Sequence, residues 1–330
     1  MPDAGWDWDR TIAVAAREDV LPALYPRLQA TVEVSDFLEA IHELNRERNR
    51  QLLNEIEMHS CLLHAAGIEP VVLKGAAYLV AGVYRDPSDR LLRDIDLLVE
   101  TAQSAKAFEI IQSSGYEPYI PNPTALVLHH HPTLTRVHRV PVEIHHQIGK
   151  GACGVFLTAR EIVAASRRVM LGRAVVRVPA PEHLLIHLIL HSQVHHAPHA
   201  RIWPSLRDMH DLVRLSRQYN LDWESIRSRF RAHRKESLLN LHLLQVEKAM
   251  HSPAPFEING GGPKWWYRQA LWREPRLRFI DPVYTFSRMA LPKIELGYRL
   301  LRLPIGRKYI LLTPFRPSFY KRFIDEIAQG

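Results

Sequence analysis

The sequence predicts an α+β fold with a helical C-terminal region, and three observations support this prediction. A helical pattern covers residues 32–67, where apolar residues recur mostly at three- and four-residue steps. Short apolar or alternating runs at 70–73, 94–99 and 137–148 are typical of strands. After Gly151 the patterns become mostly helical again. A sheet is therefore expected in the first half of the chain, with helices on either side of it in the sequence.

The composition is that of an ordinary globular protein. The chain has 330 residues, 46% of them hydrophobic, which is enough for two domains or for one domain with helical additions. Its apolar runs are too short to cross a bilayer, so we expect no transmembrane segment. Three aspartates stand among the first nine residues, where a secretory signal would have a basic region, so we expect a cytoplasmic protein. The only cysteines, Cys61 and Cys153, define neither a disulfide framework nor a thiolate metal site.

The net charge of +8 is concentrated near the C-terminus. Residues 251–330 contain fourteen Lys and Arg but only six Asp and Glu, so the rest of the chain is balanced. Such asymmetry indicates an anionic partner for the basic C-terminal region, although a solvated basic surface would have the same composition.

The first half of the chain alternates helices with strands. The long helix is expected to end at Gly67, where glycine can adopt the left-handed conformation. Lys74 and Gly75 form the turn out of the first strand. Further along, the patterns predict a helix at 76–83, a loop at 86–89, a strand at 94–99, a helix at 101–113 and a strand or strand pair at 137–148. In the last of these, Val142 and Ile144 lie on one face, and Glu143 and His145 on the other.

Four regions follow from these patterns. They are an N-terminal helical region at 1–65, a core at 66–150, a helical domain at 151–258 and a basic, aromatic-rich region at 259–330. Helices are expected at 180–190, 206–219 and 229–250. The glycine-rich stretch 260–263 is the clearest linker.

Carboxylates mark the candidate site. Asp94 and Asp96 project from the same face of a strand, because side chains alternate across it, and both can then bind one hard divalent cation. An isolated pair of this kind is a weak signal, since solvated acidic residues have the same spacing. Three features strengthen it. The apolar residues between and after the two aspartates would anchor them on a buried strand. Lys74 and Gly75 connect a strand to a helix N-terminus that suits a phosphate, and Glu143 supplies a third carboxylate on a later strand.

In this order, the motifs resemble a known family. The motifs are Val72-Leu73-Lys74-Gly75, then Tyr84, Asp86 and Arg90, then residues 93–99 and finally residues 142–145. Together they are similar to the uncharacterised nucleotidyltransferase family of the polymerase-beta-like superfamily. The similarity covers residues 69–148, with weaker similarity to about residue 215. It implies a nucleotidyltransferase fold, which is a mixed sheet with flanking helices. It also implies transfer of a nucleoside monophosphate from a nucleoside triphosphate.

The resemblance also implies roles for individual residues. Asp94, Asp96 and Glu143 would bind Mg²⁺ or Mn²⁺ and act as the catalytic triad, with Glu143 also helping to deprotonate the acceptor. Two such ions neutralise the triphosphate and align attack and departure. The candidate nucleotide contacts are Lys74, Gly75, Arg90, Arg93 and His145. For the two arginines, ion pairs with Asp86 or Asp89 are the competing explanation.

The sequence departs from the superfamily pattern at Ala76, where a serine hydroxyl is usual, and in the long gap between Gly75 and Asp94. The choice of nucleotide therefore stays open. So does the acceptor, which could be a small molecule, a sugar, a peptide or RNA. The alternative hypotheses are a toxin-like transferase that modifies transfer RNA, and a degenerate nucleotide-binding regulator or scaffold.

Other signals carry less weight. His187, His191 and His195 would share one helical face, but they lack a zinc-protease pattern and a nearby cysteine. The run 129–131 is expected to be an exposed loop. The aromatic and basic residues beyond 263 fit nucleic-acid binding or a membrane surface, but ordinary packing against the catalytic domain is favoured.

Overall fold

A computed structural model describes residues 7–28, 31–119, 129–149, 152–192 and 205–258, together with Lys264, Tyr267 and Arg268. The helices and strands named below belong to one compact unit, which is formed by residues 1–195 and 204–258. The linker predicted at 260–263 and nearly all of region 259–330 lie outside the described residues, as does His195.

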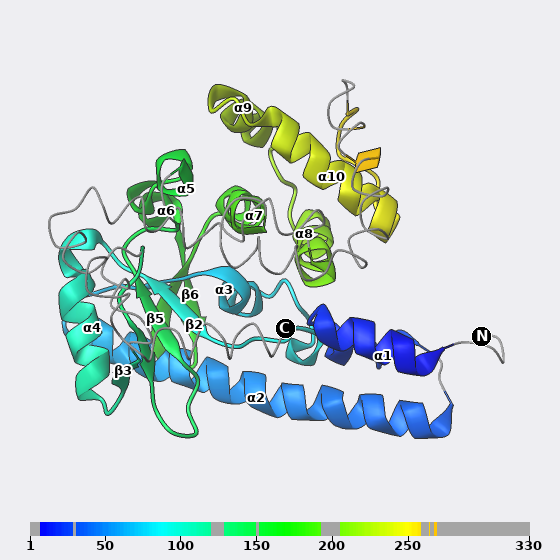
Figure 1. The fold of residues 1–330 in the computed structure, drawn as a ribbon. Helices are drawn as coiled ribbons and strands as arrows, with labels where there is room; N and C mark the ends of the chain where they lie inside the picture. The colour runs from blue at the N-terminus through cyan, green and yellow to red at the C-terminus, as the bar shows by residue number, and fades with distance from the viewer. Residues whose placement is uncertain are drawn as a thin grey trace, which may run out of the picture. The chain divides into compact units, whose positions relative to one another are not determined.

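The described elements alternate as the sequence predicts through the first half of the chain (Figure 1). The helices are α1 (Trp8–Arg17), α2 (Val32–Ala65), α3 (Lys74–Val80), α4 (Ser104–Ser113), α5 (Ala152–Phe156), α6 (Ala159–Ala165), α7 (Pro181–Leu190), α8 (Leu206–Gln218), α9 (Trp223–Ala232) and α10 (Glu236–Met250). The 3₁₀ turns are η1 (Leu21–Ala23), η2 (Pro87–Asp89) and η3 (Thr101–Gln103). The strands are β1 (Val71–Val72), β2 (Ile95–Leu98), β3 (Glu117–Tyr119), β4 (Thr133–Thr135), β5 (Val142–His145), β6 (Arg167–Leu171) and β7 (Ala174–Val178).

Seven strands of the described residues form one sheet in the order β3-β4-β5-β2-β1-β7-β6. β2 runs parallel to β5 and β1 parallel to β7, while the other neighbours are antiparallel. The sheet is therefore mixed, and with its flanking helices it confirms the α+β nucleotidyltransferase fold that was predicted.

The hairpin of β6 and β7 departs from the prediction of mostly helical structure after Gly151. Gly172 forms its turn with a positive φ of 55°. Strand β7 pairs with β1, so the hairpin joins the sheet and β6 forms one of its edges. Strand β1 is short and fully buried between β2 and β7. The predicted core at 66–150 thus contains only part of the sheet.

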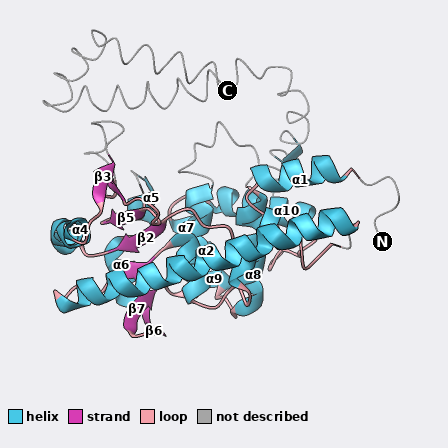
Figure 2. Cartoon of the chain, turned by 90° about the horizontal axis from the view of Figure 1, so that it is seen from below, coloured by secondary structure: helices cyan, strands magenta, loops and turns pink. Residues whose placement is uncertain are grey.

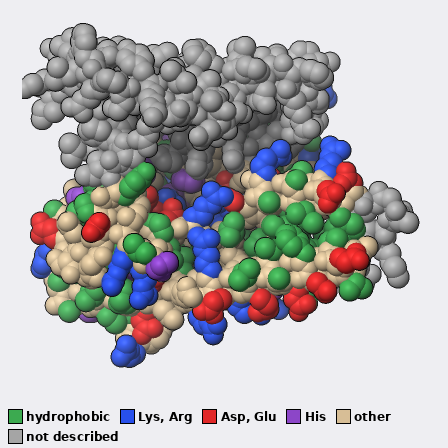
Figure 3. Space-filling view, turned by 60° about the horizontal axis from the view of Figure 1, so that its bottom comes forward, with side chains coloured by type: hydrophobic (Ala, Val, Ile, Leu, Met, Phe, Trp, Pro, Cys, Tyr) green, Lys and Arg blue, Asp and Glu red, His purple; other side chains and the backbone are tan. Residues whose placement is uncertain are grey.

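Helix α2 crosses one side of the sheet, where it packs on β7 and α4 (Figure 2). Its buried residues include several polar ones: His42, Asn45, Asn49, Glu55, His59 and Ser60. In contrast, Val32, Phe37 and Leu44 of the same helix are exposed. Figure 3 shows a face on which hydrophobic side chains gather among acidic and basic ones. The helix therefore uses polar side chains for part of its contact with the protein interior.

Helices α7 to α10 form the region that follows the sheet, and α8 packs on both α7 and α10. The helix predicted at 229–250 is in fact two helices, because Arg234 adopts a left-handed conformation with a φ of 56° between α9 and α10. In the part of the chain that the structure covers, we find no helix that combines the length and apolar character of a membrane span.

Candidate active site

The pairing of β2 with β5 brings two carboxylates together. In this parallel register Asp96 lies opposite Glu143, so the two side chains project side by side from one face of the sheet. Ile95, Leu97 and Leu98 are fully buried around Asp96, and Val142 and Ile144 are fully buried around Glu143. The alternation seen in the sequence thus places acidic groups on a rigid, buried part of the fold.

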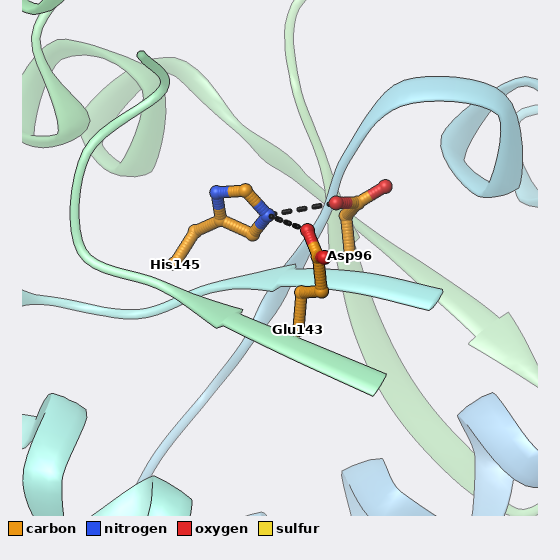
Figure 4. A group of neighbouring side chains, drawn as sticks. All are labelled: Asp96, Glu143 and His145. Atoms are coloured by element: carbon orange, nitrogen blue, oxygen red, sulfur yellow. Dashed lines mark hydrogen bonds and ion pairs between the residues drawn. The ribbon is translucent and has the colours of Figure 1, made fainter. Parts of the chain in front are cut away.

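His145 and Lys74 contact these carboxylates. The Nε2 atom of His145 lies 2.7 Å from Oδ1 of Asp96 and 3.3 Å from Oε2 of Glu143 (Figure 4). The ammonium group of Lys74 lies 2.6 Å from the same Asp96 oxygen and 3.9 Å from Oε2 of Glu143. One oxygen of Asp96 therefore accepts from both a lysine and a histidine.

These contacts shift the pKa values of the groups that take part in them. Burial by itself would raise the pKa of Asp96, but Lys74 and His145 hold that pKa well below its usual range. Burial would lower the pKa of Lys74, but Asp96 and Glu143 raise it, so the amine is protonated at neutral pH. The pKa of His145 is also raised, because its hydrogen bonds to Asp96 and Glu143 outweigh burial.

Asp94 lies immediately before β2 and adds a third carboxylate. The negative charge of Asp96, followed by burial, raises the pKa of Asp94 to about 6. The site therefore has an excess of negative charge, and any added cation would relieve the repulsion between Asp94 and Asp96.

Glu143 is held by a neighbouring strand and faces His130, for which the sequence predicts an exposed loop. The Thr133 hydroxyl on β4 donates to Oε1 of Glu143 at 3.0 Å. The Nε2 atom of His130 lies 3.8 Å from Oε2 of the same carboxylate. His129 is buried, and the rings of both His129 and His130 contact the ring of His145. The prediction that 129–131 is an exposed loop is wrong, because His130 pairs with His145 in a β-bridge beside β5.

Lys74 begins helix α3 with a left-handed backbone and a φ of 50°. A non-glycine residue rarely adopts this conformation, which costs on the order of 1–3 kcal/mol and is found disproportionately at functional sites. Gly75 follows for a packing reason. A Cβ atom there would meet the Leu92 side chain at 2.3 Å and the Arg90 guanidinium at 3.1 Å. The requirement for glycine at 75 is therefore explained by these neighbours.

Arg90 and Arg93 pair with aspartates other than Asp86 and Asp89. Buried Arg90 forms two hydrogen bonds of 2.8 Å with Asp211, which is completely buried. Arg93 is largely exposed and pairs with Asp19 at 2.5 Å. The expectation of pairs with Asp86 or Asp89 is wrong for both arginines. The arginine that pairs with Asp86 is Arg46, and those that pair with Asp89 are Arg27 and Arg214.

Two asparagines of α2 position the segment that leads to the carboxylates. The Asn45 amide donates to the carbonyls of Ser88 and Arg90 at 2.7 and 3.1 Å. The Asn49 amide donates to the carbonyls of Pro87 and Arg90 at 2.6 and 2.7 Å. The segment before Asp94 is thus fixed at its backbone by a helix more than thirty residues earlier.

This arrangement could hold a metal ion. Among the described residues, single ligand atoms from Asp96, Glu143 and His145 lie within 4.8 Å of one another. Carboxylate oxygens suit hard divalent cations, and imidazole suits transition metals. The group differs from the triad expected from the sequence in that His145 is present and Asp94 is not. Asp94 lies close enough for its charge to be coupled to the other two carboxylates.

A mixed sheet with paired carboxylates on adjacent parallel strands is the arrangement expected of a nucleotidyltransferase. The chain belongs to the uncharacterised nucleotidyltransferase family, whose model matches residues 4–251. A search of the curated proteins gave no significant match.

Among solved structures, the chain is similar to an antigenic nucleotidyltransferase-like protein from Paracoccidioides brasiliensis. The two chains are 14% identical, and the superposition covers 62% of this chain and 98% of that chain with a TM-score of 0.37.

Proposed function

We propose that this protein is a metal-dependent nucleotidyltransferase that moves a nucleoside monophosphate from a nucleoside triphosphate to a hydroxyl or phosphate acceptor. The observation that carries the proposal is the pairing of Asp96 with Glu143 on adjacent strands, with Asp94 immediately before the first strand. Family membership supports the same reaction class.

The acidic groups fit a divalent cation. The three carboxylates outnumber the one fully charged base in contact with them, Lys74, and the pKa of Asp94 is raised to about 6 by the charge of Asp96. Asp94, Asp96 and Glu143 would hold Mg²⁺ or Mn²⁺. Such ions neutralise the charge of a triphosphate and lower the barrier to attack on it.

The chain's own residues would prepare this reaction in distinct ways. Thr133 and His145 fix the orientation of Glu143, which would accept the proton of the acceptor hydroxyl. Lys74 carries a positive charge at the same carboxylates and would contact the triphosphate. Arg90 would act indirectly in this scheme, by fixing the segment before Asp94 through Asp211.

The test is incubation of the full chain with each α-labelled ribonucleoside triphosphate and Mg²⁺ or Mn²⁺, in the presence of purified RNA or a cell extract. Asp96→Asn should reduce transfer roughly a thousandfold, since the lost stabilisation is several kcal/mol and each 1.4 kcal/mol is a factor of ten. Glu109→Gln, an acid-to-amide change on the exposed surface of α4, is the matched control and should leave transfer unchanged.

The same assay separates the alternatives. Label on transfer RNA alone would identify a transfer-RNA-modifying enzyme. Nucleotide binding without transfer, equal in the wild type and in Asp96→Asn, would contradict the proposal and favour a nucleotide-binding regulator or scaffold.

A further inference from the structure

His130 lies beside the carboxylate site without being part of the group that the sequence predicts. The backbone of 129–131 runs along β5, where the His131 amide donates to the Ile144 carbonyl at 2.9 Å. This pairing points the His130 ring at Glu143, with 3.8 Å between Nε2 and Oε2. The side chain is only 13% exposed.

The proton on the His130 ring can be assigned from its other contact. Its Nδ1 atom lies 2.5 Å from the carbonyl oxygen of His131. A carbonyl oxygen only accepts, so Nδ1 carries the hydrogen, and in the neutral ring Nε2 carries a lone pair. A metal-binding histidine has this arrangement, since it donates its second ring nitrogen to a carbonyl or carboxylate and presents the first to the ion.

His145 has the opposite arrangement. Its Nε2 atom contacts carboxylate oxygens of Asp96 and Glu143, which only accept, so Nε2 carries the hydrogen. Its Nδ1 atom is buried and has no hydrogen-bond partner among the described residues. To present a lone pair to an ion, the ring would have to place its proton on Nδ1, where no acceptor is available. His145 therefore serves as a donor that orients the carboxylates.

The distance between His130 and Glu143 suits two ligands of one ion. Ligands about 2.1 Å from an ion lie about 3–4 Å apart for ligand-ion-ligand angles of about 90° to 140°. The observed 3.8 Å falls in this range. It is too long for a hydrogen bond, and no hydrogen is available on the nitrogen for one.

We propose that Nε2 of His130 and the carboxylate of Glu143 bind one divalent ion at this site, and that the imidazole makes the site prefer Mn²⁺, Co²⁺ or Zn²⁺ over Mg²⁺. Imidazole suits transition metals, whereas Mg²⁺ takes oxygen ligands and water. The inference rests on the metal dependence in the proposed function and adds the identity of a ligand and the class of the ion.

Pulsed electron paramagnetic resonance of Mn²⁺ bound to the full chain tests the assignment directly, because it detects a nitrogen bonded to the ion. The wild type should show modulation from one imidazole nitrogen. His130→Ala should lose it, whereas His145→Gln and the exposed control His64→Ala should keep it. Mn²⁺ affinity should fall about tenfold to a hundredfold in His130→Ala, with the affinity for Mg²⁺ little changed. Because alanine could disturb the chain beside β5, His130→Gln provides a second variant, and circular dichroism checks the fold of each.

The possible outcomes are distinct. Bound Mn²⁺ without nitrogen modulation would mean an all-oxygen site, and modulation lost only in His145→Gln would identify His145 as the ligand; either result overturns the inference and leaves the proposed function standing. Failure of the wild type to bind any of these ions would overturn the inference and the metal dependence together.

Discussion

Two clusters of charged side chains are buried in the protein. One is the Arg90 cluster, which consists of Arg90, Asp211 and Tyr84, and the other is the carboxylate site around Asp96. They differ in balance. In the Arg90 cluster one guanidinium meets one carboxylate through two hydrogen bonds, and the Tyr84 hydroxyl donates to Asp211 at 2.6 Å. At the carboxylate site, three acids share Lys74 and His145.

The difference separates scaffold from candidate site. The Arg90 cluster satisfies its own charges, so it can fix the segment that leads to β2 without any ligand. The carboxylate site keeps an excess of negative charge, which raises the pKa of Asp94 to about 6. Burial is common to both, so charge balance is the more informative property when a functional site is sought.

The largest expected effect concerns the Arg90 cluster. Arg90→Ala leaves Asp211 buried without its counter-ion, and we expect a loss of about 3–5 kcal/mol in the free energy of unfolding, measured by urea denaturation. Arg93→Ala is the matched control. Its exposed pair with Asp19 should contribute less than about 1 kcal/mol. Equal losses in the two variants would show that the Arg90 cluster is not the scaffold inferred here.

A second change tests whether the carboxylate site needs Glu143 to be held in its observed orientation. Thr133→Val removes the hydroxyl that donates to Glu143, and we expect metal affinity and transfer activity to fall about tenfold to a hundredfold. The free energy of unfolding should change by less than about 1 kcal/mol. Thr135→Val, on the same strand, loses only a 3.4 Å contact to the Glu117 carbonyl and should behave as wild type. Equal activity in both variants would mean that Glu143 needs no support from β4.

The most gradual effect depends on pH and concerns a third buried cluster, in which His59 lies 3.3 Å from the Tyr116 hydroxyl, which itself donates to Glu55. Burial, with a lesser contribution from Arg139, lowers the pKa of His59 from 6.5 to about 4. As the pH falls, His59 is therefore protonated in the unfolded chain before it is protonated in the folded protein. The protonation of His59 leaves the free energy of unfolding unchanged above pH 6.5. It lowers this free energy as the pH drops from 6.5 towards 4, by up to about 1.4 kcal/mol per pH unit.

His59→Gln should make this fall shallower by about one proton, measured by urea denaturation between pH 7.5 and 4.5. The wild-type slope should not disappear entirely, because burial also lowers the pKa of His210 and of His242 to about 4. An unchanged slope in His59→Gln would show that its ring is already protonated or accessible in the folded protein.

The sequence predicted the parts of the molecule that depend on local pattern. The helix expected at 32–67 is α2, and the alternation at 142–145 correctly placed Glu143 and His145 on one face. The β6–β7 hairpin was not predicted, although Gly172 stands between two short runs that contain β-branched and other apolar residues, because helical patterns lie on both sides of it in the sequence.

Other features depend on partners far along the chain. Arg90 meets Asp211 across 121 residues, and no local signal identifies that partner. The sequence around His130 is typical of an exposed loop, whereas a bridge to His145 brings this histidine to Glu143. The buried side of α2 could not be predicted from apolar spacing either, because its buried asparagines form hydrogen bonds with a loop instead of packing against apolar side chains.

The contacts of these asparagines can form only after their partners have been synthesised. Asn45 and Asn49 leave the ribosome about forty residues before the carbonyls that they bind. The pairing of β1 with β7 can form only later, because Val71 pairs with Arg177 of β7. In a nascent chain that ends before β7, strand β1 therefore pairs with β2 alone, and its other edge stays unpaired until β7 has been synthesised.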